Sequence, residues 1–238
     1  MIRRPPRSTQ GVSSAASDVY KRQVEIGTRN IKVALRRLRK FARQSTDYEL
    51  DMDGTIKSTA RNAGILDINM IPERTNHVKV LIFFDVGGSM DPYIKLCEEL
   101  FSALKTEFKH LKYFYFHNCV YESVWEDNRR RTQERFLVQD IINKYSADYK
   151  VIFVGDATMA PYEITNAGGS IEHWNEEPGG ATIRRLCDHF DRVAWLNPVP
   201  DDHWDYTSSL CIIRELVDNR MFPLTLKGLE EGMSELSK

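Results

Sequence analysis

Three residues that suit metal chemistry occupy alternate positions in one short segment. Asp85, Gly87 and Ser89 can face the same side of an extended chain, because successive residues of such a chain point to opposite sides. The apolar run Val80 to Phe84 before them predicts a buried strand, and residues 92–108 after them predict a helix. A carboxylate and a hydroxyl therefore follow a strand, where open α/β sheets bind ligands. Such oxygen ligands suit Mg²⁺, Ca²⁺ or Mn²⁺.

Two more residues with oxygen-bearing side chains stand where one predicted element gives way to the next. Asp156 follows the apolar strand predicted over 150–154, and Thr132 opens the helix predicted over 133–145. Both would lie on loops at the same edge of the sheet as the first group. A simpler role stays open for each of these residues, since Ser, Thr and Asp also cap helices.

From residue 78 onward, predicted strands alternate with predicted helices. The strands cover 78–84, 113–116, 120–125, 150–154, 193–196 and a short stretch near 221–223, and the helices cover 92–108, 133–145, 179–190, 204–217 and 225–236. This alternation favours an α/β fold with a doubly wound, mostly parallel sheet and helices on both faces. We expect that domain to span residues 78–238.

Residues 24–77 are expected to form a small helical appendage before the domain. Apolar residues at helical spacing between Ile31 and Ala42 predict an amphipathic helix. Asp53 is expected to cap a short second helix that ends near Gly64. Residues 66–72 are a possible edge strand.

Residues 1–23 differ in composition from everything that follows them. They are rich in Ser, Arg and Pro, lack hydrophobic periodicity, and resemble translated sequencing-adapter sequence, so we expect a non-native, disordered segment. A natural basic tail is the alternative. The segment carries a net charge of +4 and the whole chain −1, which leaves −5 on residues 24–238. If the segment is adapter sequence, the natural N-terminus is missing.

Composition excludes several classes of protein. The chain has no long apolar run and no visible signal peptide, so neither a membrane partner nor secretion is expected. Its four cysteines are scattered, as is usual in a reducing cytoplasm. The acidic body gives no reason to expect nucleic-acid binding.

From residue 24 onward the chain resembles the CoxE-like branch of von Willebrand factor A proteins. The resemblance is carried by the basic helix Ile31–Arg43, by Asp53-Gly-Thr-Ile56, Thr59-Ala-Arg-Asn62 and Pro72-Glu-Arg74, and by the run from Val80 to Met90. It implies a Rossmann-like von Willebrand fold and a cytosolic bacterial protein that works beside a MoxR-type AAA+ ATPase. In that family such pairs are linked to maturation of metal cofactors or to remodelling of protein complexes.

The loop from Asp85 to Ser89 resembles the metal ion-dependent adhesion site of this family, whose pattern is Asp-x-Ser-x-Ser. By this resemblance one divalent cation, Mg²⁺ or else Mn²⁺ or Ca²⁺, is held by four residues: Asp85, Ser89, Thr132 and Asp156. A partner protein then supplies the last acidic ligand. Gly87 stands where the first serine is usual, so we expect a water or backbone group in that position and weak binding of the metal alone.

A second motif offers an enzyme as the alternative. Asp51-Met-Asp-Gly-Thr55 spells the nucleophile motif Asp-x-Asp-Gly-Thr of Mg²⁺-dependent, haloacid dehalogenase-type phosphatases. That chemistry needs Asp51 at the end of a buried strand, ready to attack phosphorus, with Asp53 close by. The residues from Thr46 to Leu50 do not predict such a strand, and helix capping by Asp53 explains the segment better. We therefore expect no catalytic activity.

Two loops rich in tryptophan, histidine and acidic residues, 168–180 and 195–204, are expected to reach the same edge of the sheet. We expect ordered loops whose tryptophans, Trp174, Trp195 and Trp204, pack down. Trp174 and Trp204 are also our candidate anchors for a protein partner. The leading hypothesis is a non-catalytic, metal-dependent adaptor between the ATPase and a client protein. A metal-free interaction domain is a further alternative, because Gly87 supplies no ligand.

Overall fold

The computed structural model describes residues 28–41, 48–72 and 78–238, and its main sheet has five parallel strands. The strand order is β4-β3-β7-β8-β9. The strands are β3 (Lys79–Asp85), β4 (His110–Phe116), β7 (Lys150–Val154), β8 (Arg192–Asn197) and β9 (Met221–Pro223). Every neighbouring pair in this order is parallel. The predicted α/β fold with a mostly parallel sheet is confirmed.

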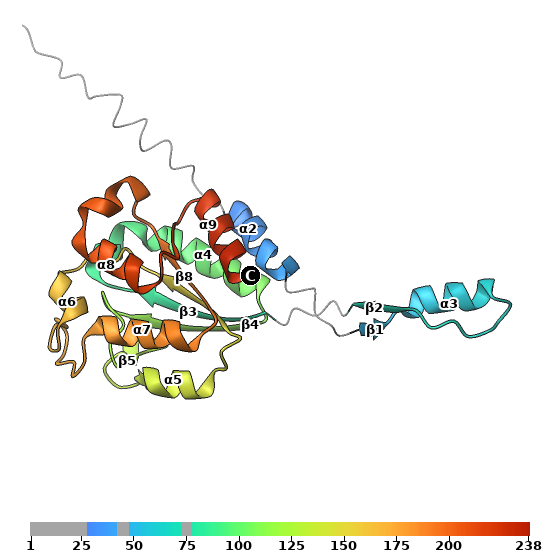
Figure 1. The fold of residues 1–238 in the computed structure, drawn as a ribbon, viewed down its shortest axis with the longest axis horizontal. Helices are drawn as coiled ribbons and strands as arrows, with labels where there is room; N and C mark the ends of the chain where they lie inside the picture. Colours follow the sequence, from blue (N-terminus) through green and yellow to red (C-terminus); the bar gives the residue numbers. More distant parts are fainter. Residues whose placement is uncertain (1–27, 42–47, 73–77) are drawn as a thin grey trace, which may run out of the picture.

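Helices cover both faces of the sheet (Figure 1). One face carries α2 (Thr28–Phe41), α4 (Ile94–Glu107) and α9 (Leu226–Leu236). The other carries α5 (Val138–Lys144), α7 (Gly179–His189) and α8 (Ser208–Leu216). The sheet therefore separates two hydrophobic cores. Within the described ranges, none of the helices is long and apolar enough to cross a membrane.

The central strand β3 sends alternate side chains into the two cores. Val80, Ile82 and Phe84 pack on the side of α2, α4 and α9, whereas Leu81 and Phe83 pack on the opposite side. This alternation follows from the two-residue period of a strand. Because both sides of β3 are buried, its register is fixed, and so is the place where it ends.

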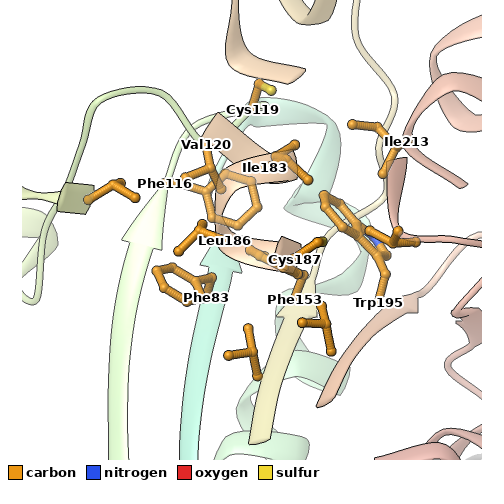
Figure 2. Packing of buried hydrophobic residues seen from close by; sticks show 14 of the residues in the cluster. Phe83, Phe116, Cys119, Val120, Phe153, Ile183, Leu186, Cys187, Trp195 and Ile213 are labelled. Carbon is orange, nitrogen blue, oxygen red and sulfur yellow. The ribbon is translucent and has the colours of Figure 1, made fainter. Parts of the chain in front are cut away.

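Aromatic rings stack across three neighbouring strands on the second side of the sheet (Figure 2). The ring centroid of Phe153 lies 5.1 Å from that of Phe83 and 5.3 Å from that of Trp195, and both pairs are stacked. Phe116 meets Trp195 edge to face at 6.3 Å. Rings of this size contribute much of the buried apolar area, so they hold the carboxyl ends of β3, β7 and β8 together.

Helix α2 belongs to this domain and is not part of an appendage. Its apolar face is buried against α4 and α9 through four side chains: Ile31, Ala34, Leu35 and Leu38. Arg36 also donates from Nε to Glu107 Oε1 at 3.1 Å, at the end of α4. The domain therefore begins earlier than the expected boundary, because the pattern of an amphipathic helix does not reveal which surface receives it.

Residues 48–72 form a unit of their own, set apart from the sheet in Figure 1. Strand β1 (Tyr48–Leu50) pairs antiparallel with β2 (Met70–Pro72), and α3 (Met52–Arg61) connects them. Of the possible edge strand at residues 66–72, only β2 forms, and it pairs with β1 instead of the main sheet. Residues 1–23, expected to be disordered, lie outside the described residues.

The cap of α3 differs from our prediction. Asp51 is the capping residue, and its Oδ1 accepts a hydrogen bond from Gly54 N at 3.0 Å. The prediction that Asp53 caps this helix is wrong, since Asp53 lies within the first turn. Both residues have the right chemistry for a cap, and the end of β1 at Leu50 decides between them.

The segment between β4 and α5 differs most from the prediction. The helix predicted to begin at residue 133 begins at Val138, after a short 3₁₀ turn, η2 (Asn128–Arg130), and strand β6 (Phe136–Leu137). β6 pairs antiparallel with β5 (Ser123–Val124). Three further short helices follow strands: η1 (Gly88–Tyr93), α6 (Pro161–Thr165) and η3 (Asp201–Tyr206). In the segment before α5, the pairing of β6 with β5 replaces the first turn of the predicted helix.

Candidate functional site

The sheet reverses its order between β3 and β7. From β3 the chain continues to β4 on one side, and later to β7, β8 and β9 on the other. Doubly wound sheets bind ligands at the carboxyl ends of the strands where such a reversal occurs. Asp85 is the last residue of β3, and Asp156 follows the end of β7. The two predicted carboxylates therefore meet at the place that the topology favours.

Asp85 is a buried carboxylate with one satisfied and one unsatisfied oxygen. Its Oδ1 accepts hydrogen bonds from Gly87 N at 2.8 Å and Asn118 N at 2.9 Å. Its Oδ2 is buried and has no hydrogen-bond partner among the described residues. Burial raises the pKa of Asp85 to about 7, the two backbone hydrogen bonds oppose that rise, and the charges of Asp156 and Glu163 add to it. A buried acceptor without a partner is costly, and this oxygen is a natural ligand for a cation.

Asp156 is the second buried carboxylate of the site, with 3% of its surface exposed. Its Oδ1 accepts from Thr158 N at 3.0 Å, and its side chain also hydrogen-bonds with Ser89. Burial raises the pKa of Asp156, while the hydrogen bonds from Thr158 and Ser89 lower it in part. The Ser89 hydroxyl thus connects the loop after β3 to the loop after β7.

Gly155 allows the ends of the two strands to approach each other. A Cβ atom at this position would lie 2.9 Å from Asp85 Cβ and 3.2 Å from Asp85 Oδ2. The Gly155 carbonyl also accepts a hydrogen bond from Trp195 Nε1 at 2.8 Å. A side chain at position 155 would therefore displace the Asp85 carboxylate, and the aromatic layer beneath fixes the backbone beside it.

Two residues of this site were not predicted, Asn118 and Glu163. Asn118 Nδ2 donates to Glu163 Oε2 at 3.0 Å, and Glu163 Oε1 accepts from Ala160 N at 3.1 Å. The sequence carries a signal for each residue alone. Asn118 stands in a turn between predicted strands, and Pro161 followed by a glutamate is typical of a first helical turn. No local sequence pattern predicts that these two residues, 45 positions apart, form a hydrogen bond with each other.

Thr132 is not brought together with the other predicted ligands. It is exposed on a turn after η2. The structure gives no hydrogen bond from Thr132 to Asp85, Ser89 or Asp156, all of which lie in the described part of the chain. Its role as a metal ligand stays a prediction. The neighbouring Arg131 pairs with Glu172 at 3.1 Å, which ties this turn to the loop before α7.

Comparison with known families agrees with this geometry. Residues 24–124 match the family model described as VWA domain containing CoxE-like protein. This match supports a CoxE-like von Willebrand factor A domain protein. The match contains Asp85, Ser89 and Asn118 and ends before Asp156, which the continuing sheet then supplies. No curated protein and no solved structure matches the chain.

Von Willebrand factor A domains are commonly protein-interaction modules, and the family therefore makes protein interaction the broad role of this chain. One expected anchor is available for such a role in the CoxE-like domain, because Trp174 is 76% exposed. Its loop is held in place by His173 Nε2, which lies 2.8 Å from Glu122 Oε1. Trp204 packs down, as expected of its loop, and is not an available anchor, because this side chain is buried and donates from Nε1 to Val199 O at 2.9 Å.

The donor atoms of the CoxE-like site limit which metal it suits. Among the side chains of residues 28–41, 48–72 and 78–238, no group of three or more His, Cys, Asp or Glu is arranged to hold a metal ion. The site offers instead the carboxylates of Asp85 and Asp156 and the hydroxyl of Ser89. Mg²⁺ is often bound through one or two carboxylates while it keeps several waters. The donor set therefore fits Mg²⁺ or Mn²⁺, with Ca²⁺ as a related hard cation, better than zinc or copper.

Asp51 of the phosphatase motif lies outside this site. It caps α3 and follows β1, which belongs to its own two-stranded sheet. Its Oδ1 is already engaged with Gly54 N. The structure thus places the motif in a helix start and not at the end of a buried central strand.

Proposed function

We propose that this chain is a non-catalytic, metal-dependent protein-binding module whose metal is held by Asp85, Ser89 and Asp156. The observation that carries the proposal is the buried, unpartnered Oδ2 of Asp85 at the reversal of the sheet. The charged side chains that act most strongly on Asp85 are two further carboxylates, Asp156 and Glu163, and neither of them is basic. A buried carboxylate in such surroundings is best stabilised by a cation or by a proton.

Each residue has a separate task in this proposal. Asp85 supplies the buried carboxylate oxygen, and its position is fixed by the backbone hydrogen bonds to its other oxygen. Asp156 supplies the second acid, and Ser89 a hydroxyl at the exposed side of the site. When bound, the ion would offer a coordination position to a carboxylate from a partner protein. The exposed Trp174 would give that partner an apolar contact.

We further propose that the partner is a MoxR-type AAA+ ATPase and that the module connects it to a client protein, in metal-cofactor maturation or in complex remodelling. The support for this step is the CoxE-like family alone. The exposed Ser89 and Trp174 are compatible with a protein surface.

Isothermal titration of the full chain with MgCl₂ and MnCl₂ tests the metal site directly. Capture of a MoxR-type AAA+ ATPase should then be compared in Mg²⁺ and in excess chelator. We expect metal binding by the chain alone to be weak and to tighten when the ATPase is present, because binding linkage is reciprocal. Equal capture with and without chelator would replace this proposal by a metal-free interaction domain.

A further inference from the structure

Asn118 occupies the space into which a side chain at position 87 would extend. A Cβ atom added to Gly87 would lie 2.2 Å from Asn118 Oδ1 and 3.2 Å from Asp85 Oδ1. These two oxygens therefore border the same small space. In the family pattern this position carries a serine hydroxyl, and in this chain it carries hydrogen only.

Hydrogen bonding fixes which end of the Asn118 amide faces Gly87. The Glu163 carboxylate accepts at both oxygens, from Asn118 Nδ2 at 3.0 Å and from Ala160 N at 3.1 Å. A carboxylate cannot donate to an amide oxygen, so the amide nitrogen must face Glu163. The Oδ1 atom then points toward Gly87, where no hydrogen bond to it is found within the described residues.

The backbone of Asn118 is also committed to the site. Its N–H donates to Asp85 Oδ1, and its φ angle is +56°, in the left-handed region. Asparagine is one of the few residues other than glycine that adopt this region readily. A glycine would suit this turn more easily, so the conformation alone does not account for the carboxamide.

We propose that the side-chain oxygen of Asn118 is a ligand of the same metal ion, in the role left empty by the missing serine at position 87. The inference rests on the proposed metal site. An amide carbonyl is a hard oxygen ligand of the kind that Mg²⁺, Mn²⁺ and Ca²⁺ accept. Glu163 is then a positioning residue, which orients the amide without touching the ion.

The first test is metal affinity of the full chain, measured by isothermal titration with MgCl₂ and MnCl₂. Asn118→Gly keeps the left-handed turn and removes the oxygen, so we expect the affinity to fall by about tenfold or more. Asn219→Gly is the matched control, because Asn219 is exposed and has a φ of +58°. That control should bind metal as the parent does.

A second variant leaves Asn118 in the sequence and moves its side chain. Gly87 has a φ of −60°, which alanine adopts without strain. Gly87→Ala should therefore act mainly through its clash with the Asn118 amide, because the contact to Asp85 Oδ1 at 3.2 Å is less tight, and it should weaken metal binding as Asn118→Gly does. Gly88→Ala is its control, because a Cβ atom there would meet nothing within 4 Å.

The double variant Gly87→Ser with Asn118→Gly makes room for the hydroxyl of the family pattern. We expect it to bind metal more tightly than Asn118→Gly alone, a rescue that a purely structural role for Asn118 would not produce. If Asn118→Gly and Gly87→Ala both fold and bind metal like the parent, Asn118 is not a ligand. If the parent itself binds no Mg²⁺ or Mn²⁺, the proposed metal site fails instead.

Discussion

Asp51 and Asp85 begin two segments of similar composition, Asp-Met-Asp-Gly-Thr and Asp-Val-Gly-Gly-Ser, and the fold uses them differently. Asp51 is half-buried, and it caps α3 by accepting from Gly54 N. Asp85 is buried at the end of a central strand, with one oxygen on backbone N–H groups and the other without a partner. The first carboxylate completes local structure, and the second is available for a ligand.

The strand before each aspartate makes the difference. β1 has three residues, of which Tyr48 and Leu50 are exposed, and it pairs only with β2. β3 has seven residues, nearly all buried, and pairs on both sides. A strand buried on two faces holds its last residue in a largely buried position. A short sequence motif therefore does not define a site unless the strand before it is buried in the sheet.

The largest expected effect concerns the pH dependence of the metal-free protein. The pKa of Asp85 is about 7 in the fold, against an ordinary 3.8, so between these values the folded state binds more protons than the unfolded state. The free energy of unfolding therefore falls as pH rises through this window, by up to about 4 kcal/mol. Asp85→Asn should remove much of this decline, to which the raised pKa of Asp156 also contributes.

Urea unfolding in chelator at pH 5, 6, 7 and 8 measures this effect in the parent and in Asp85→Asn. Some carboxylates elsewhere, such as Asp148 and Asp218, have lowered pKa values and act in the opposite direction in the parent and the variant alike. Parallel pH profiles for the parent and Asp85→Asn would show that Asp85 does not carry this titration.

The next largest effect is on metal binding. Asp85→Ala removes the buried carboxylate oxygen and should weaken Mg²⁺ binding by about a hundredfold or more, since even residues that only support a ligand contribute tenfold to a hundredfold. Asp51→Ala should not change the affinity, because Asp51 lies in the separate unit. The measurement is isothermal titration in parallel with circular dichroism. A loss of binding in Asp51→Ala with the fold intact would contradict the contrast between the two aspartates.

Much of the main domain could be predicted from local pattern. The apolar run before Asp85 and the apolar run before Asp156 each gave a strand close to its observed bounds, because a strand buried on both faces is apolar throughout. The failures arose where long-range contacts decide. α2 joins the core by packing on α4 and α9, and β6 forms because it pairs with β5. Neither partner is adjacent in sequence.

The candidate site was predictable only in Asp85, Asp156 and Ser89. Asp85 and Asp156 follow strands that the sequence shows, and parallel strands bring their ends together. Asn118 and Glu163 meet through a turn and a short helix, and the loop composition does not reveal that Trp204 packs down whereas Trp174 stays exposed. These features depend on side-chain directions set by tertiary structure.

A smaller effect distinguishes the two predicted hydroxyl ligands. Ser89 hydrogen-bonds to Asp156 at the site, whereas Thr132 is exposed on a turn. Ser89→Ala should weaken Mg²⁺ binding by about tenfold, the lower end of what a supporting residue contributes. Thr132→Ala should leave the affinity of the chain alone unchanged. If Thr132→Ala weakens binding as much as Ser89→Ala does, the turn after η2 must reach the metal.

The smallest expected effect belongs to Asp51. Loss of a helix cap costs about 1 kcal/mol, and neither hydrophobic core contains a residue of 48–72. Asp51→Ala should therefore speed hydrogen exchange of the α3 amides by about fivefold and leave the amides of β3 unchanged. Asp53→Ala, in the first turn, should have a smaller effect through the helix dipole. The same proteins can be assayed for hydrolysis of p-nitrophenyl phosphate with Mg²⁺. Hydrolysis by the parent that disappears in Asp51→Ala, but persists in Asp85→Ala, would reverse the roles of the two aspartates and make the chain an enzyme.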